Sequence, residues 1–206
     1  MARSKPHWER IYSKEGTQNV GWYEAHLGTS LELITGTGVG SRARIIDVGG
    51  GASTLVDDLL DRGFRNITVL DLTLTGLSLA KARLGARAKF VQWIEGDIKE
   101  APLQENYYDL WHDRALFHFL TTQEDRERYV KAMRCALRPR AHLIMATFSL
   151  EAPPRCSGLD VVRYGPDQLH RQLGNDLTLK ESRLELHVTP GGVKQQYLYC
   201  HFQLPE

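Results

Sequence analysis

The sequence has few cysteines, no long apolar run and no excess of charge of one sign. Cys135, Cys156 and Cys200 are scattered, odd in number and lack C-x-x-C spacing, which argues against a disulfide framework and a structural zinc site. No stretch of about 18 apolar residues could span a bilayer. The polar opening segment 1–16 lacks the pattern of a secretory leader. We therefore expect a reduced, cytoplasmic protein without a metal site or a membrane segment.

The charge balance disfavours one class of partner. The 26 lysines and arginines nearly match the 25 acidic residues, for a net charge of +1. Nucleic-acid binders usually show an excess of basic residues or a basic stripe, so the charge balance disfavours a nucleic-acid substrate. A length of 206 residues with 42% hydrophobic content suits one soluble globular domain. We expect a single domain over 1–206, present as a monomer or at most a weak dimer.

Short apolar runs alternate with segments of helical periodicity, which predicts a parallel sheet covered by helices. The end of the chain instead predicts an antiparallel hairpin, joined through Thr189-Pro190-Gly191-Gly192. The first 40 residues are expected to form a helical cap over the cofactor and substrate site. Strands are predicted over 43–48, 67–72, 90–94, 108–112, 142–149, 177–188 and 195–203, and helices over 53–62, 75–84, 121–137 and 166–173.

A glycine-rich turn follows the first predicted strand. Ile45-Ile46-Asp47-Val48 leads into Gly49, Gly50 and Gly51, and a helix is predicted to begin near Ser53. Glycine lets the backbone turn tightly and approach a ligand closely, and ligands of open α/β sheets sit at the carboxyl ends of such strands. Taken alone, the turn also fits an ordinary strand-to-helix loop.

Asp71 ends the second predicted strand, about 20 residues beyond the glycine turn, where an acid can accept hydrogen bonds from ribose hydroxyls. An aspartate after a strand is also common as a helix cap. Together the turn and Asp71 indicate an adenine-nucleoside cofactor.

Three features of the sequence argue against NAD as that cofactor. The turn lacks the third glycine of G-x-G-x-x-G, Asp97 follows the third strand where an adenine amino group can be recognised, and the terminal strand pair is antiparallel.

These residues resemble the class I S-adenosylmethionine-dependent methyltransferases over nearly the whole chain. The segment D-V-G-G-G-A-S from Asp47 is similar to the family's first motif, and 137–141 (L-R-P-R-A) is similar to its L-x-P-G-G turn, with Arg140-Ala141 in place of the glycine pair. The resemblance implies an α/β fold with a Rossmann-like, seven-stranded, mostly parallel sheet, helices on both faces and an antiparallel C-terminal hairpin. It implies S-adenosyl-L-methionine as cofactor, bound by Asp47, Gly49, Gly50, Gly51, Ser53, Asp71, Leu72, Asp97 and Ile98.

A narrower resemblance concerns the N-terminal aromatic residues. The spacing of Trp8 and Tyr12, followed by Trp22-Tyr23, resembles a bacterial branch similar to eukaryotic lysine methyltransferases of the citrate-synthase and elongation-factor type. That resemblance implies that Tyr12, Trp22 and Tyr23 cover the cofactor. The alternative is that these rings pack a helix onto the core. The fourth motif of those relatives differs from His112-Asp113-Arg114, so lysine specificity does not carry over.

The residues after the fourth predicted strand are candidates for catalysis, because the family's transferable methyl group faces the end of that strand. His112, Asp113 and His118 are candidate general bases. A core or capping role is the stronger reading for His118. Arg114 is expected to pair with Asp113 or, alternatively, to bind an anionic substrate. The loop 153–159 is expected to line the acceptor pocket, but nothing marks Cys156 as a nucleophile.

The acceptor is predicted to be a small molecule or a protein side chain. The fourth strand is followed by no D-P-P-Y or N-P-P-Y segment, typical of adenine methylation in DNA, and by no Pro-Cys pair, typical of cytosine C5 chemistry. Two other functions remain open from the sequence. One is a catalytically inactive S-adenosylmethionine-binding regulatory protein, and the other is a nicotinamide-dependent oxidoreductase.

Overall fold

Seven strands form one sheet in the order β3-β2-β1-β4-β5-β9-β8 in the computed structural model, which describes residues 4–206. Strands β1 to β5 run parallel, whereas β9 pairs antiparallel with β5 and β8 antiparallel with β9. The predicted α/β fold with its antiparallel C-terminal hairpin is confirmed. The strands are β1 (Arg44–Val48), β2 (Asn66–Asp71), β3 (Val91–Glu95), β4 (Tyr108–Arg114), β5 (Leu137–Phe148), β8 (Thr178–Val188) and β9 (Lys194–Gln203).

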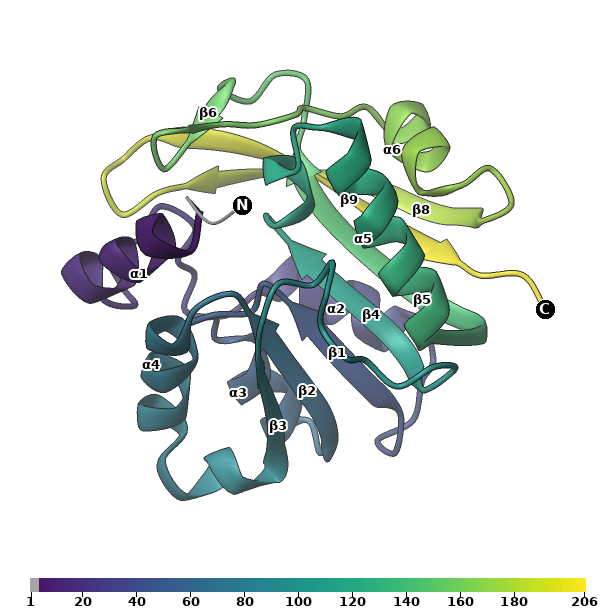
Figure 1. Cartoon of the computed structure of the whole chain (residues 1–206), viewed down its shortest axis with the longest axis horizontal. Coiled ribbons are helices and arrows are strands. Elements are labelled where there is room, and N and C mark those ends of the chain that lie inside the picture. The colour runs from purple at the N-terminus through teal and green to yellow at the C-terminus, as the bar shows by residue number, and fades with distance from the viewer. Residues whose placement is uncertain (1–3) are drawn as a thin grey trace.

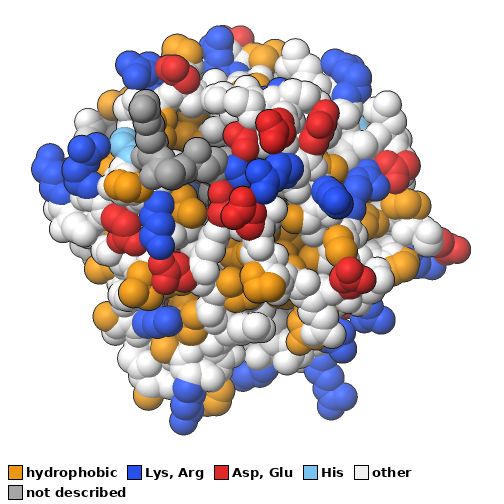
Figure 2. Space-filling view, in the orientation of Figure 1, with side chains coloured by type: hydrophobic (Ala, Val, Ile, Leu, Met, Phe, Trp, Pro, Cys, Tyr) orange, Lys and Arg blue, Asp and Glu red, His pale blue; other side chains and the backbone are white. Residues whose placement is uncertain are grey.

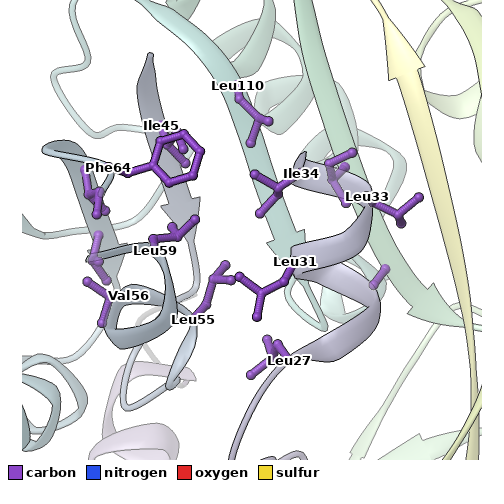
Figure 3. Packing of buried hydrophobic residues seen from close by; sticks show 14 of the residues in the cluster. Leu27, Leu31, Leu33, Ile34, Ile45, Leu55, Val56, Leu59, Phe64 and Leu110 are labelled. Atoms are coloured by element: carbon purple, nitrogen blue, oxygen red, sulfur yellow. The ribbon is translucent and has the colours of Figure 1, made fainter. Parts of the chain in front are cut away.

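Helices cover both faces of the sheet (Figure 1). Successive side chains of a strand point to opposite faces, so Ile45 belongs to the hydrophobic cluster on one face and Ile46 to the cluster on the other. Figure 3 shows the first of these faces, where Leu31 packs beside Leu55 and Ile34 lies near Leu110. The first face carries α2 (Gly28–Gly36), α3 (Leu55–Asp61) and α4 (Leu74–Leu84), and the second carries α5 (Gln123–Ala136) and α6 (Pro166–Leu173).

The first 40 residues divide into two helices with different positions. Helix α1 (Ser4–Glu15) lies beside α4 (Figure 1) and places Tyr12 against the glycine turn. Helix α2 instead packs on a face of the sheet, with Leu31 and Ile34 fully or nearly fully buried. Only α1 and the segment between the helices therefore lie in the position expected of a cap. Residues 1–3 of the expected cap lie outside the described residues.

The boundary between α5 and β5 differs from the prediction. The helix ends at Ala136, as a break before Arg138-Pro139 predicts, but β5 begins at once with Leu137 rather than at His142. A bulge accommodates the intervening residues, because Leu137 pairs with Tyr108 and His142 already pairs with Leu110. Arg140 has a φ of 62° there, the left-handed conformation that a glycine takes easily. The turn therefore keeps a glycine-like backbone without the glycine.

Several short elements escaped the sequence prediction. The loop after β5 contains a small hairpin of β6 (Arg155–Cys156) and β7 (Leu159–Asp160), and two 3₁₀ helices span Gly85–Phe90 and Phe117–Phe119. Figure 2 shows acidic and basic side chains interspersed on one face of the molecule, which agrees with the balanced charge. Among residues 4–206, no helix is both long and apolar enough to cross a membrane.

Candidate functional site

A pocket lies at the carboxyl ends of β1, β2 and β4, where ligands of parallel α/β sheets bind. Gly51 forms part of the turn beside the pocket without contributing to its lining, and neither Asp113 nor His118 is among the lining residues. The other predicted site residues all line it, namely Tyr12, Trp22, Asp47, Gly49, Gly50, Ser53, Asp71, Leu72, Asp97, Ile98 and His112.

The backbone of the glycine turn has a conformation that lets a ligand approach it closely. Gly49 and Gly51 have φ angles of 73° and 43°, a region that favours glycine. The N–H groups of Gly49 and Gly50 donate to the Leu70 carbonyl at 2.8 and 3.1 Å, which ties the turn to β2. A Cβ on Gly50 would lie 2.6 Å from Asp47 Oδ2. A side chain at any of these positions would therefore close space at the carboxyl end of β1.

Arg83 of α4 binds two backbone carbonyl groups at the end of the glycine turn, a contact that the sequence did not predict. Its Nη1 donates to the Ala52 carbonyl at 2.8 Å, and its Nη2 donates to the Ser53 carbonyl at 2.5 Å. The same guanidinium pairs with Asp57 at 2.7 Å. Nothing in the helical periodicity of α4 distinguishes Arg83 from other exposed basic residues, because its partners lie about 30 residues earlier in the chain.

Asp47 and His112 lie side by side because their strands pair in register. Asp47 Oδ1 and His112 Nδ1 are 2.7 Å apart, and His112 Nε2 is 2.9 Å from Ser30 Oγ of α2. The other carboxylate oxygen, Asp47 Oδ2, is buried without a hydrogen-bond partner. Asp47 therefore presents an unpaired acceptor in the lining of the pocket.

Asp71 lies at the end of β2 and is almost fully buried. Its Oδ1 accepts hydrogen bonds from the N–H of Thr73 at 2.8 Å and from the Thr73 hydroxyl at 2.6 Å. Burial raises the pKa of Asp71 to about 6, although these hydrogen bonds act in the opposite direction. Thr73 also caps α4 by accepting from the N–H of Gly76 at 3.3 Å. The two oxygens are thus differentiated, with Oδ1 held by the protein.

Asp97 occupies the corresponding place after β3. Its Oδ1 accepts from the N–H of Lys99 at 3.1 Å, and Lys99 Nζ lies 3.5 Å from Asp97 Oδ2. The same ammonium contacts Asp125 of α5 at 2.6 Å. Neighbouring Ile98 is buried and contributes an apolar surface to the pocket. An acid beside an apolar wall is thus held between the sheet and α5.

Aromatic rings from the N-terminal segment, those of Trp8, Tyr12 and Trp22, line one side of the pocket. Trp22 makes edge contacts with Trp8 and Tyr12, at centroid distances of 5.6 and 5.9 Å, and Trp8 contacts Phe119 at 4.9 Å. Burial and the nearby Asp71 raise the pKa of Tyr12 well above its ordinary value. These rings pack on one another and line the pocket at the same time. Their covering of the cofactor stays a prediction.

A buried ion pair forms the side of the pocket beyond β4. Arg114 pairs with Glu24 rather than with Asp113, which corrects the expectation for its partner. Arg114 Nη1 also donates to the Trp22 carbonyl at 2.8 Å, and Glu24 lies 3.1 Å from Nδ1 of His187. Burial acts to raise the pKa of Glu24, but the His187 hydrogen bond and the Arg114 charge bring it below its ordinary value. Glu24 and Arg114 therefore both carry charge at neutral pH.

Cys156 lies in the loop after β5. It lines the pocket and is 4% exposed. Burial raises the pKa of its thiol, which disfavours the thiolate that a nucleophile requires. Among residues 4–206, no cluster of three or more histidine, cysteine, aspartate or glutamate side chains is placed to hold a metal.

The structure gives two of the candidate bases no access to the pocket. Strand β4 continues through Arg114, so Asp113 points to the face opposite His112. There it accepts hydrogen bonds from the Tyr129 hydroxyl at 2.6 Å and from the N–H of Leu116 at 3.0 Å. His118 is fully buried, and its Nδ1 accepts from the N–H of Phe148 at 3.1 Å. Burial lowers the pKa of His118 to about 3, so it is a neutral core residue.

The sequence of residues 46–145 matches the family described as methyltransferase domain. This stretch contains the glycine turn and the acids at the ends of β1 and β2, and carries through β3 to most of β5. This match supports the assignment of these residues to a class I S-adenosylmethionine-dependent methyltransferase domain. S-Adenosylmethionine is its cofactor.

Relatives by sequence agree with this assignment. The methyltransferase is 25% identical over 122 residues to the eEF1A lysine and N-terminal methyltransferase of Danio rerio, and 22% identical over 126 residues to that of Homo sapiens. These alignments cover 59% and 60% of the chain but only 17% and 18% of the relatives. The chain therefore spans less than a fifth of the length of the curated relatives it matches.

Solved structures share the fold. A SAM-dependent methyltransferase from Methanosarcina mazei has a TM-score of 0.70 at 16% identity and covers 84% of this chain and 98% of its own. The 1,6-didemethyltoxoflavin-N1-methyltransferase of Burkholderia thailandensis, with bound 1,6-didemethyltoxoflavin and S-adenosylhomocysteine, has a TM-score of 0.69 at 18% identity. It covers 100% of this chain and 85% of its own.

The contact between Tyr12 and the glycine turn gives a first testable prediction. A Cβ on Gly51 would lie 2.1 Å from the Tyr12 hydroxyl oxygen, so Gly51→Ala should push α1 off the turn. We expect a loss of stability of about 2 kcal/mol in urea denaturation, from the clash and the left-handed backbone together. Adding Tyr12→Phe, which removes that oxygen, should recover part of the loss.

Gly63→Ala is the matched control. Gly63 has a φ of 89° with nothing within 4 Å of the added Cβ, so this variant reports backbone strain alone. We expect it to cost about 1 kcal/mol. Equal costs for the two alanine variants, or no recovery with Tyr12→Phe, would show that the Tyr12 contact does not restrict position 51.

Proposed function

We propose that this methyltransferase acts on a small molecule or a single protein side chain that enters the pocket on the side formed by Arg114, Glu24 and Cys156. The observation that carries the proposal is the division of the pocket into two sides. One side has three acids and the glycine turn at the ends of β1, β2 and β3, and the other has the buried Arg114–Glu24 pair. The first suits the donor, which leaves the second for the acceptor.

The residues present fit the cofactor. The unpaired Asp47 Oδ2 suits an ammonium group, and the turn at Gly49 and Gly50 leaves the space that a Cβ would fill. We propose that Asp71 binds the ribose hydroxyls and Asp97 the adenine amino group, with Gly51, Ser53, Leu72 and Ile98 shaping the same side and Tyr12 and Trp22 covering it. When bound, S-adenosylmethionine supplies a methyl group already activated by a sulfonium.

The protein's own contribution is orientation rather than proton transfer. Both ring nitrogens of His112 are occupied by Asp47 and Ser30, and Asp113 and His118 lie outside the pocket lining. We assign none of the three as a general base. The acceptor then reacts as a nucleophile that carries a lone pair on arrival, and alignment in the pocket lowers the barrier.

Labelled transfer tests the proposal. The protein is incubated with methyl-labelled S-adenosylmethionine and cell extract, and the products are separated by molecular size. We expect enzyme-dependent label in a small-molecule or a protein fraction, and loss of that label with Asp71→Asn. Binding of S-adenosylhomocysteine without label in any fraction would contradict methyl transfer and leave a binding role.

The cytoplasmic location expected from the sequence stays a prediction.

A further inference from the structure

Three buried side chains form a continuous hydrogen-bonded row beneath the donor side of the pocket. Ser30 Oγ lies 2.9 Å from His112 Nε2, and His112 Nδ1 lies 2.7 Å from Asp47 Oδ1. Their exposed fractions are 0% for Ser30, 1% for His112 and 3% for Asp47. Burying three polar side chains together costs free energy unless each is hydrogen-bonded, and each of the three has a partner within the row.

The row resembles a Ser-His-Asp hydrolytic triad in order and spacing, but its position excludes that chemistry. A nucleophilic serine must reach a substrate carbonyl. Ser30 is fully buried within α2. That helix is fixed in place because Leu31 and Ile34 pack into the hydrophobic cluster that also contains Leu110 of β4 (Figure 3). The open end of the row is Asp47, the member that lines the pocket together with His112.

The two oxygens of Asp47 have different surroundings. Oδ1 is held by His112, whereas Oδ2 is buried and has no hydrogen-bond partner. A buried carboxylate oxygen without a donor is costly, and a cationic N–H group is the donor that compensates it best. The space beside Oδ2 exists because position 50 is glycine, whose added Cβ would lie 2.6 Å from that oxygen.

We propose that His112 is a positioning residue which, held by Ser30, fixes the Asp47 carboxylate so that Oδ2 meets the ammonium group of the cofactor's amino-acid end. The proposal rests on the proposed function, because it concerns the donor side of the same pocket. It replaces the predicted role of His112 as a base. His112 acts through Asp47, and Ser30 acts through His112 by holding the second ring nitrogen.

Two ligands separate this role from a general structural one. S-Adenosylhomocysteine carries the ammonium group, whereas 5′-methylthioadenosine has the same adenosine and a thioether but no amino-acid end. Calorimetry should show that His112→Leu weakens binding of S-adenosylhomocysteine about tenfold, or about 1.4 kcal/mol. Binding of 5′-methylthioadenosine should change less than about twofold.

Asparagine is the matched variant, since it is close to leucine in size and can donate to Asp47 from its side-chain amide. His112→Asn should therefore keep S-adenosylhomocysteine affinity within about threefold of wild type. Ser30→Ala, a small change that tests the row if His112→Leu does not fold, should weaken S-adenosylhomocysteine alone by about threefold. Ser149→Ala is the control, because Ser149 is another buried serine, hydrogen-bonded to Gln196 and outside the pocket lining.

Equal weakening of both ligands by His112→Leu or Ser30→Ala would overturn the proposal, as would unchanged S-adenosylhomocysteine affinity in His112→Leu. Failure of the proposed function has a different signature, because the labelling experiment would then show no enzyme-dependent label in any fraction, whatever the affinities of the variants for the two ligands.

Discussion

Replacing Asp71 with asparagine should weaken S-adenosylhomocysteine binding about 30-fold and raise the free energy of unfolding of the unliganded protein by up to about 3 kcal/mol at pH 7.5. The loss of affinity reflects about 2 kcal/mol for hydrogen bonds to a charged group. The gain in stability follows from burial, which raises the pKa of Asp71 from 3.8 to about 6. Two pKa units correspond to about 3 kcal/mol.

The sign of the stability change sets its pH dependence. Because the pKa of Asp71 is higher in the folded protein, the unfolded chain releases the proton more readily, and ionised Asp71 costs stability. That cost is absent below pH 3.8, grows up to about pH 6 and is complete above it. The difference in unfolding free energy between Asp71→Asn and wild type should follow the same course in urea denaturation from pH 4 to 8.

Asp113→Asn is the control for this pair of effects. Burial also raises the pKa of Asp113 to about 6, but Asp113 does not line the pocket. It should show a similar pH-dependent gain in stability with unchanged S-adenosylhomocysteine affinity. Wild-type affinity in Asp71→Asn would refute the ribose contact, and a stability difference independent of pH would refute the raised pKa.

Replacing Arg114 with methionine should cost about 3 kcal/mol of stability and most of the transferase activity. Arg114 is 5% exposed and is an ion-pair partner of Glu24, whose side chain is 21% exposed. Removing one member of a buried pair leaves the other charge poorly compensated, at about 3–5 kcal/mol. We expect the lower end because His187 also contacts Glu24. Loss of the hydrogen bond from Arg114 to the Trp22 carbonyl should also make the aromatic residues that line the pocket less firmly held.

A double-mutant cycle separates the pair from the loss of packing. Glu24→Gln combined with Arg114→Met should be more stable than the sum of the single changes by about 2 kcal/mol, measured by urea denaturation. Arg128→Met is the control for an exposed ion pair, because Arg128 pairs with Glu100 and the two side chains are 43% and 66% exposed, respectively. It should change the free energy of unfolding by less than about 0.5 kcal/mol. Additive costs for Glu24 and Arg114 would show that they are not coupled.

The strands and the positions of the residues at the ends of β1 and β2 were predictable because their signals are local. Buried apolar runs predict β1 and β2. The glycine turn after β1 and Asp71 at the end of β2 reach the same edge of a parallel sheet. The end of β4 was less predictable, since nothing in the sequence shows that the strand continues to Arg114. That continuation sends His112 and Asp113 to opposite faces, which a loop assignment could not show.

Contacts distant in sequence account for the rest. Ser30 carries no signal of its own in a helix, and it meets His112 only because α2 packs on β4. The bulge at Arg140 depends on the chain's far end, where its N–H donates to the Pro205 carbonyl at 2.9 Å. The Glu24–Arg114 pair likewise joins residues about 90 positions apart. Such pairings follow from tertiary packing rather than from local pattern.

The two sides of the pocket come from different stretches of the chain. Asp47, Asp71 and Asp97 lie within the matched segment 46–145, whereas Glu24 and Cys156 lie outside it. Of the charged and thiol groups opposite the donor side, Arg114 alone belongs to that segment. On the proposed division of the pocket, likeness over the matched segment therefore concerns the donor side and says little about which acceptor is chosen. Exchange of the flanking stretches could redirect the enzyme to another acceptor while its affinity for the donor stayed unchanged.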